Sequence, residues 1–217
     1  MRYIFYIKER GKLLSFIIVV IVLFLIPGPA VLLTISQTAQ GGRKTGIITG
    51  IGIAVGDLIH TIAAVLGLSA ILMTSALAFE IVKYLGAAYL IFLGIKSLLE
   101  KSKKQDAPTV KKNNTATSFR QALLIELLNP KTALFFLAFL PQFVHNNGTP
   151  VVIQLLILGL TFVLMSIMYT TLLAFLTSTI GERLFSNQSG KLSRWQGKVI
   201  GSIYIGLGLQ LVFQNQK

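Results

Sequence analysis

The sequence lacks cysteine altogether and carries little charge. Its 217 residues include no Cys, only 7 Asp and Glu, and two histidines, His60 and His145. Without cysteine the chain cannot form disulfides or use thiolates in catalysis or metal binding. Two histidines so far apart also argue against the usual zinc sites, so we expect no metal and no cofactor. Charged residues make up 12% of the chain, against about 25% in soluble domains.

What the chain has instead is long apolar stretches. It is 53% hydrophobic, and about 20 apolar residues are enough to span the hydrocarbon core of a bilayer. The candidate spans are residues 13–38, 46–73, 77–99, 121–144, 151–177 and 199–213, the last being the shortest. This pattern predicts an all-α, polytopic integral membrane protein with six transmembrane helices in one domain.

The formal net charge of +13 raises the alternative of a nucleic-acid partner. However, the Lys and Arg residues lie between the apolar runs, where they suit anionic lipid headgroups, so we expect no nucleic acid. The lysine-rich segment 100–120 predicts a solvated loop. Together with residues 43–44 and 181–198 it forms the more basic side, which the positive-inside rule places in the cytoplasm with both termini outside. The basic start, residues 2–12, favours the opposite orientation.

Six spans divide into two halves, roughly 13–99 and 121–213. The third and sixth spans share a Gly-x-x-Tyr pattern at Gly86/Tyr89 and Gly201/Tyr204. The first and fourth spans are both interrupted by proline, and an odd number of spans per half makes the halves inverted. The pattern predicts a 3+3 inverted repeat with broken first and fourth helices. The alternative is chance recurrence of Gly and Tyr in apolar helices.

The two interruptions are the clearest chemical signal. They consist of Pro27, Gly28 and Pro29 in the first span and of Asn129, Pro130 and Lys131 in the fourth. Proline has no N–H, so the carbonyls of Leu23, Leu25 and Glu126 lose their helical donors. An unpaired carbonyl in lipid costs several kcal/mol, so such breaks persist only against protein or a water-filled cavity. The freed carbonyls suit an ammonium group, a cation or water; the alternative is a kink that only shapes packing.

The second span places a carboxyl group deep in the membrane. Asp57 lies about 16 Å into the span at 1.5 Å per residue. It shares one helical stripe with small and polar residues, namely Gly46, Gly50, His60, Thr61 and Ala64; Gly52 and Gly56 form a second small-residue pair. An intramembrane Asp is by default a functional candidate. The alternatives are an Asp that is neutral or paired with Lys131 for structure alone, and a His60 that only packs.

Glu126 is the other acidic residue deep within a span, and Lys131 is the base at comparable depth. Glu126 is the weaker acid candidate, because it lies one turn before the second break. The phenylalanines that follow fit ordinary helix packing.

Three stretches resemble the LysE/RhtB family of amino-acid exporters. They are "PGPAVLLTISQTAQGGRKTGIITGIGIAVGDLIHTIAAVLGLSAIL", "YLGAAYLIFLGIKSL" and "LLNPKTALFFLAFLPQFV". The family's Pro-Gly-Pro falls on Pro27 to Pro29, its Gly-Asp on Gly56 and Asp57, and its Asn-Pro-Lys on Asn129 to Lys131. The resemblance implies secondary active export of amino acids or their derivatives across the bacterial cytoplasmic membrane. The basic residues 1–12 are unlike the start of typical members.

On this basis we expect proton antiport by alternating access, with no enzymatic activity. Ionised Asp57 would bind the substrate ammonium, Lys131 with Asn129 would hold the carboxylate, and a proton on Asp57 would release the substrate. No G-x-x-x-x-G-K-[ST] loop for ATP is present. The alternatives are an inorganic cation transporter, which Lys131 disfavours, and a non-transporting membrane assembly protein. The sequence does not specify the amino acid, and it leaves homo-oligomerisation open.

Overall fold

The computed structural model describes residues 2–74, 76–99, 115–144 and 149–180, together with residues 198, 201, 202, 204–209, 212 and 213. Within these ranges every regular element is helical. The elements are α1 (Arg2–Leu25), α2 (Pro29–Thr74), α3 (Ala76–Leu99), α4 (Thr115–Leu127), α5 (Pro130–Leu134), the π-helix η1 (Phe135–Phe139), the 3-10 helix η2 (Leu140–Phe143) and α6 (Val151–Ile180). The predicted all-α class is confirmed.

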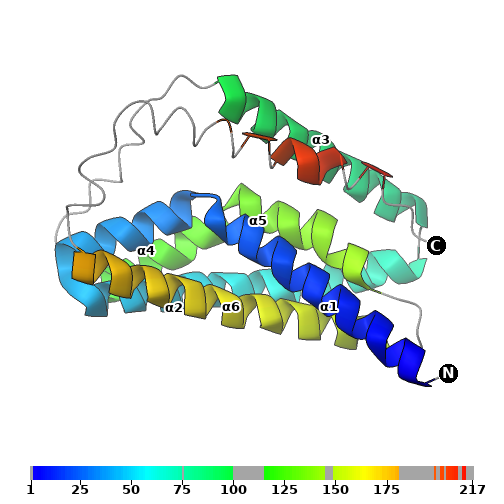
Figure 1. Cartoon of the computed structure of the whole chain (residues 1–217), viewed down its shortest axis with the longest axis horizontal. Helices are drawn as coiled ribbons and strands as arrows, with labels where there is room; N and C mark the ends of the chain where they lie inside the picture. Colours follow the sequence, from blue (N-terminus) through cyan, green and yellow to red (C-terminus); the bar gives the residue numbers. More distant parts are fainter. Residues whose placement is uncertain are drawn as a thin grey trace.

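Helix α2 is two arms joined at Gly42. This glycine has φ 76° and ψ 180°, a conformation that residues with a side chain rarely adopt. The Gly46 backbone lies directly against the Thr38 side chain, although residues eight apart would be about 12 Å apart along one helix. The chain therefore folds back on itself here, as the turn at the left of Figure 1 shows. The first arm continues α1 beyond a break, and the second arm matches the predicted span 46–73.

Among the described residues, two helical segments pass a test of length and hydropathy for crossing a membrane, Pro29–Leu68, which includes the Gly42 turn, and Val151–Thr179. A third is obtained if Thr115–Leu127 and Pro130–Phe143, which meet at a bend of 44°, count as one broken span. Among the described residues, Leu13–Leu25 is a shorter apolar helix. These lengths and compositions fit a membrane protein.

The predicted loop 100–120 extends too far at its C-terminal end. Helix α4 begins at Thr115, and residues 100–114 lie outside the described residues. The polar composition around Thr115 suggested a loop, but Ser118 is fully buried and its hydroxyl donates to the Gln37 side chain at 3.0 Å. The Ser118 side chain therefore binds another helix rather than water.

Small residues bring α2 and α6 into close antiparallel contact. A Cβ atom added to Gly50 would lie 2.6 Å from Thr170 Oγ1, and one added to Gly46 would lie 2.8 Å from Ala174 Cβ. Further along, Gly159 of α6 lies against the Thr61 side chain. The predicted close approach of another helix to the Gly50 stripe is confirmed, and that helix is α6.

Helix α3 pairs with the C-terminal helical residues on one side of the molecule (Figure 1). A Cβ on Gly94 would lie 2.8 Å from the Gly201 carbonyl oxygen, and one on Gly201 would lie 2.7 Å from that of Gly94. Gly208 meets Ala87 and Ile91, so the two segments run antiparallel. Glycine at both positions is what permits backbone contact this close.

Candidate functional site

The chain breaks twice inside its apolar helices, and the two breaks meet. The first separates α1 from α2 at residues 26–28, and the second separates α4 from α5 at residues 128–129. The Lys131 ammonium donates to the backbone carbonyls of Leu23 at 3.1 Å and Ile26 at 3.0 Å. A Cβ added to Gly28 would touch that ammonium at 3.4 Å. A side chain from the second break thus satisfies carbonyls at the first.

The second break is organised by Asn129. Its Oδ1 accepts a hydrogen bond from the Lys131 backbone N–H at 3.1 Å, which caps α5 in the way Asn commonly caps a helix. Its Nδ2 donates to the two carboxyl oxygens of Glu126 at 3.3 and 3.2 Å. The amide therefore connects the start of α5 to a buried acid.

His60 also binds the backbone at the second break. Pro130 deprives the Glu126 carbonyl of its helical donor, and that carbonyl accepts from the Asn129 N–H at 3.0 Å and from His60 Nε2 at 3.1 Å. The acceptor fixes a hydrogen on Nε2. The His60 ring also stacks on Phe136, with centroids 5.8 Å apart. This geometry matches the packing alternative for His60.

The two acids form one buried pair. Asp57 and Glu126 are 1% and 2% exposed, and their carboxyl groups interact with each other. A Cβ on Gly56 would lie 2.8 Å from Glu126 Cβ, so glycine is needed for α4 to come this close. The Asp57 carboxyl also contacts Ser166 of α6. Its second oxygen, Oδ2, is buried and has no hydrogen-bond partner among the described residues.

The charges of this cluster do not balance. With histidine counted as neutral, the described residues bring two carboxyl groups and one ammonium, that of Lys131, within electrostatic reach of one another. An uncompensated charge in a membrane interior costs several kcal/mol. The cluster is therefore suited to take up one further positive charge, either a proton or the ammonium group of a ligand.

The predicted site residues fall into three groups. The structure brings together Asp57, His60, Glu126, Asn129 and Lys131, with Gly28 and Gly56 as the places of close approach. The prolines shape the breaks, and Pro29 and Pro130 are the first residues of α2 and α5. Gly50 lies apart, packed on Thr170.

Two features were missed by reading the sequence. One is a small and polar stripe on α6, made of Gly159, Ser166, Thr170, Ala174 and Thr177; its spacing of three, four or seven residues was the available signal. The other is a buried polar layer in which the Gln37 amide donates to Gln121 at 3.1 Å while Ser118 donates to Gln37. Thr34, Thr38 and Thr49 are also buried. The interior between the cluster and the Gly42 turn is thus rich in hydroxyl and amide groups.

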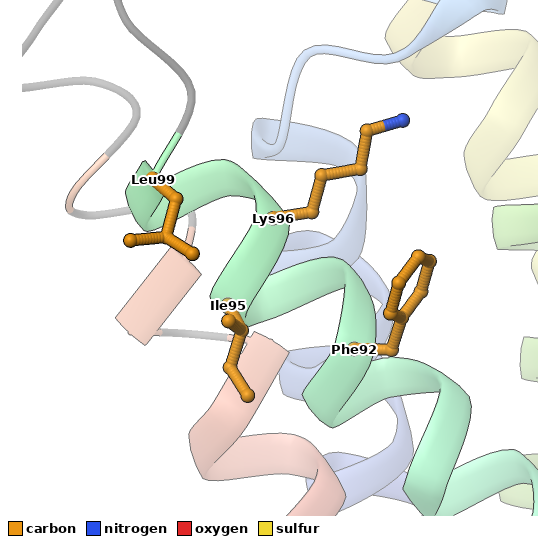
Figure 2. A pocket seen from close by; sticks show the side chains of 4 residues that line it. All are labelled: Phe92, Ile95, Lys96 and Leu99. Carbon is orange, nitrogen blue, oxygen red and sulfur yellow. The ribbon is translucent and has the colours of Figure 1, made fainter.

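A separate groove lies on the surface of α3. It has a volume of about 370 Å³ and is lined by Phe92, Ile95, Lys96 and Leu99. Figure 2 shows the Lys96 side chain extending away from Ile95 and Leu99, with Phe92 one turn along the helix. None of the buried acids lines this groove, so it is distinct from the charged cluster.

Apolar helices around a buried charged cluster at paired helix breaks define a membrane transport protein. The LysE type translocator model matches residues 21–215, which is nearly the whole sequence, and the chain belongs to that family. Family members are transporters, so the protein is a translocator rather than an enzyme.

Individual relatives match over almost their full length. The chain is 33% identical over 208 residues to the uncharacterized membrane protein YrhP of Bacillus subtilis (strain 168), covering 92% of this chain and 97% of that protein. It is 31% identical over 188 residues to the leucine efflux protein of Enterobacter sp. (strain 638), covering 86% and 88%. The leucine efflux protein of Salmonella typhimurium is 30% identical over 202 residues, covering 91% and 92%. No solved structure matches the chain.

Proposed function

We propose that this protein is a secondary active exporter of neutral amino acids, leucine first among them, which it exchanges for protons. The observation that carries the proposal is the partnerless Asp57 Oδ2 in a buried cluster of two carboxyl groups and one ammonium. The similarity to leucine efflux proteins over most of the chain supports the substrate class. Substrate and proton would then compete for one site.

The exchange follows from the charge of the cluster. When neither acid is protonated, one negative charge is uncompensated, and the ammonium of an amino acid neutralises it at Asp57 Oδ2. When a proton arrives from the other side, it neutralises the same charge and the ammonium is released. The Asp57 carboxylate binds either the proton or the substrate ammonium in turn but not both, and the carboxylate of the zwitterion needs hydrogen-bond donors of its own in the site. This alternation couples the two fluxes.

The aromatic rings packed next to the cluster disfavour a charged substrate side chain. The Phe136 ring, stacked on His60, also lies 5.0 Å from the Phe162 ring, and the Phe135 ring lies 5.0 Å from that of Phe162. All three rings are buried. A hydrophobic wall beside an ammonium-binding carboxyl favours neutral, apolar amino acids over those with a charged side chain.

The driving force is sufficient for concentrative export. One proton entering for one zwitterion leaving moves one charge, worth about 2.3 kcal/mol at 100 mV. Since 1.4 kcal/mol is a factor of ten, the exchange supports roughly a 50-fold gradient of amino acid.

We also propose six crossings of the bacterial cytoplasmic membrane, in two inverted halves, with both termini outside. Helix α1 with the first arm of α2 runs toward the Gly42 turn, the second arm runs back, and α6 is antiparallel to that arm (Figure 1). The antiparallel pairing of α3 with Gly201 and Gly208 adds support for a sixth crossing. The two breaks occupy corresponding places in the proposed halves, and they meet at Lys131.

A whole-cell efflux panel tests this function. Cells that lack their own leucine exporters are preloaded with labelled leucine, threonine or lysine through dipeptides, and loss of label is followed with and without the protein. We expect the fastest protein-dependent efflux for leucine. Efflux of lysine alone, or of an inorganic cation such as rubidium but no amino acid, would overturn the proposal.

A further inference from the structure

Lys131 connects two parts of the chain that are far apart in sequence. Its ammonium bonds to carbonyls 108 and 105 residues away, those of Leu23 and Ile26. The side chain is 8% exposed. Leu23 O is one of the carbonyls that proline frees at the first break, and Ile26 O lies in the break itself.

Two of the three N–H groups of this ammonium are used by the backbone. A lysine ammonium has three donors, and strong hydrogen bonds from a charged donor to carbonyls are favourable inside a membrane, where no water competes. A substrate carboxylate would have to displace these bonds or share the third donor. This geometry fits a lysine with a structural role better than a lysine whose donors are free to bind a ligand.

We propose that Lys131 is a positioning residue that ties the two helix breaks together, rather than the residue that holds the substrate carboxylate. We name the two bonds from Lys131 to Leu23 and Ile26 the break tie. The tie fixes the end of α1 to the start of α5. It thereby sets where the first break lies relative to the carboxyl pair.

The break tie is connected to the carboxyl pair through one residue. Asn129 caps the Lys131 N–H with its oxygen and donates to Glu126 with its nitrogen. Glu126 in turn interacts with Asp57. Movement of the first break is thus linked, through Lys131 and Asn129, to the place where the substrate ammonium and the proton are proposed to bind. The inference goes beyond the proposed function, because it holds for whatever ion or substrate the pair takes.

The absence of cysteine from the sequence makes a direct test available. A single Ile26→Cys reporter lies at the first break, where Ile26 is 1% exposed, and its labelling by a water-soluble maleimide is measured in permeabilised membranes. Lys131→Met keeps the length and removes the donors, while Lys131→Arg keeps donors and charge. Leucine transport by each variant without the reporter gives KM and maximal rate.

We expect slow labelling with Lys131, at least fivefold faster labelling with Lys131→Met, and near-native labelling with Lys131→Arg. For Lys131→Met the maximal rate should fall at least tenfold while KM changes less than threefold. Failure of Lys131→Met to accumulate in the membrane, with recovery in Lys131→Arg, would equally support the tie, because a residue that only holds substrate is not needed for folding. Unchanged labelling in Lys131→Met, with KM for leucine raised tenfold or more, would overturn it.

Discussion

His60 Nε2 lies 3.1 Å from the backbone carbonyl of Glu126, the carbonyl that Pro130 leaves without its helical donor. A histidine in the second arm of α2 thus donates to the backbone of the broken region between α4 and α5, as Lys131 does for Leu23. In each case a basic side chain from a distant segment satisfies a carbonyl freed by proline. This is how the membrane interior tolerates two breaks in apolar helices.

The first prediction concerns this histidine. His60→Leu removes one of the two donors to the Glu126 carbonyl, which keeps the Asn129 N–H, and should destabilise the protein by about 0.5–1.5 kcal/mol. His60→Gln keeps an N–H donor and should lose less. Thermal unfolding in detergent, followed by size-exclusion chromatography, ranks the stabilities of the native protein, His60→Gln and His60→Leu. If His60→Gln were fully stable but changed the pH dependence of efflux, the ring would be part of the proton pathway instead of the packing.

Gly56, which lies against the carboxyl pair, can be compared with Gly67, which has no close neighbour. In Gly56→Ala the new methyl group would lie 2.8 Å from Glu126 Cβ, and such overpacking costs about 1–3 kcal/mol. In Gly67→Ala nothing lies within 4 Å of the new methyl, so stability should be unchanged or slightly raised by helix propensity. We expect a lower Tm and reduced efflux for Gly56→Ala only. Equal behaviour of the two variants would contradict the close contact between α2 and α4.

Removing the charge of Glu126 tests the charge balance of the cluster. Glu126→Gln leaves one carboxyl and one ammonium, a balanced cluster that no longer requires a proton. The variant resembles the protonated cluster, from which the ammonium is released, so we expect both proton-driven efflux and exchange of internal for external leucine to fall at least tenfold. Asp57→Glu should keep partial activity, limited by space beside Ser166 and Gly56. Proton-driven efflux at the native rate in Glu126→Gln would show that Asp57 carries the coupling alone.

Orientation is tested with reporters. The larger basic side predicts that a reporter active only in the cytoplasm is active when inserted near Lys104 and silent when fused after Lys217. The reverse result would mean that the basic residues 2–12 set the orientation. In that case the charged cluster would keep its internal geometry, but the direction assigned to each half of the exchange would be reversed.

The sequence allowed the chemistry of the site to be predicted better than its contacts. Proline positions fixed both breaks because a missing N–H is a local property. Asp57, Glu126 and Lys131 were recognised because charge is rare within apolar spans. Their convergence on one cluster was therefore a reasonable expectation, and the structure has it.

The contacts themselves depend on how distant segments are placed. Nothing near Lys131 in sequence indicates that its ammonium lies on Leu23 and Ile26. The freed Leu23 carbonyl was expected to suit an ammonium group, a cation or water, and the group that it binds is an ammonium of the protein itself. Ser166 was missed because α6 is so apolar that a single hydroxyl group within it gives no pattern. The small and polar stripe of α6 is recognised as a contact surface only once the packing of Gly50 on Thr170 is known.

Proton flux in reconstituted liposomes tests the central claim most directly. Vesicles are loaded with leucine and an internal pH indicator at zero membrane potential, and a leucine gradient is imposed by dilution. For the native protein we predict that downhill leucine movement drives protons in the opposite direction, with a pH change that reverses when the gradient is reversed. Asp57→Asn, inserted and folded as judged by chromatography, should show neither flux. Leucine movement without any pH change in the native protein, or native fluxes of both species in Asp57→Asn, would contradict exchange at this carboxyl pair.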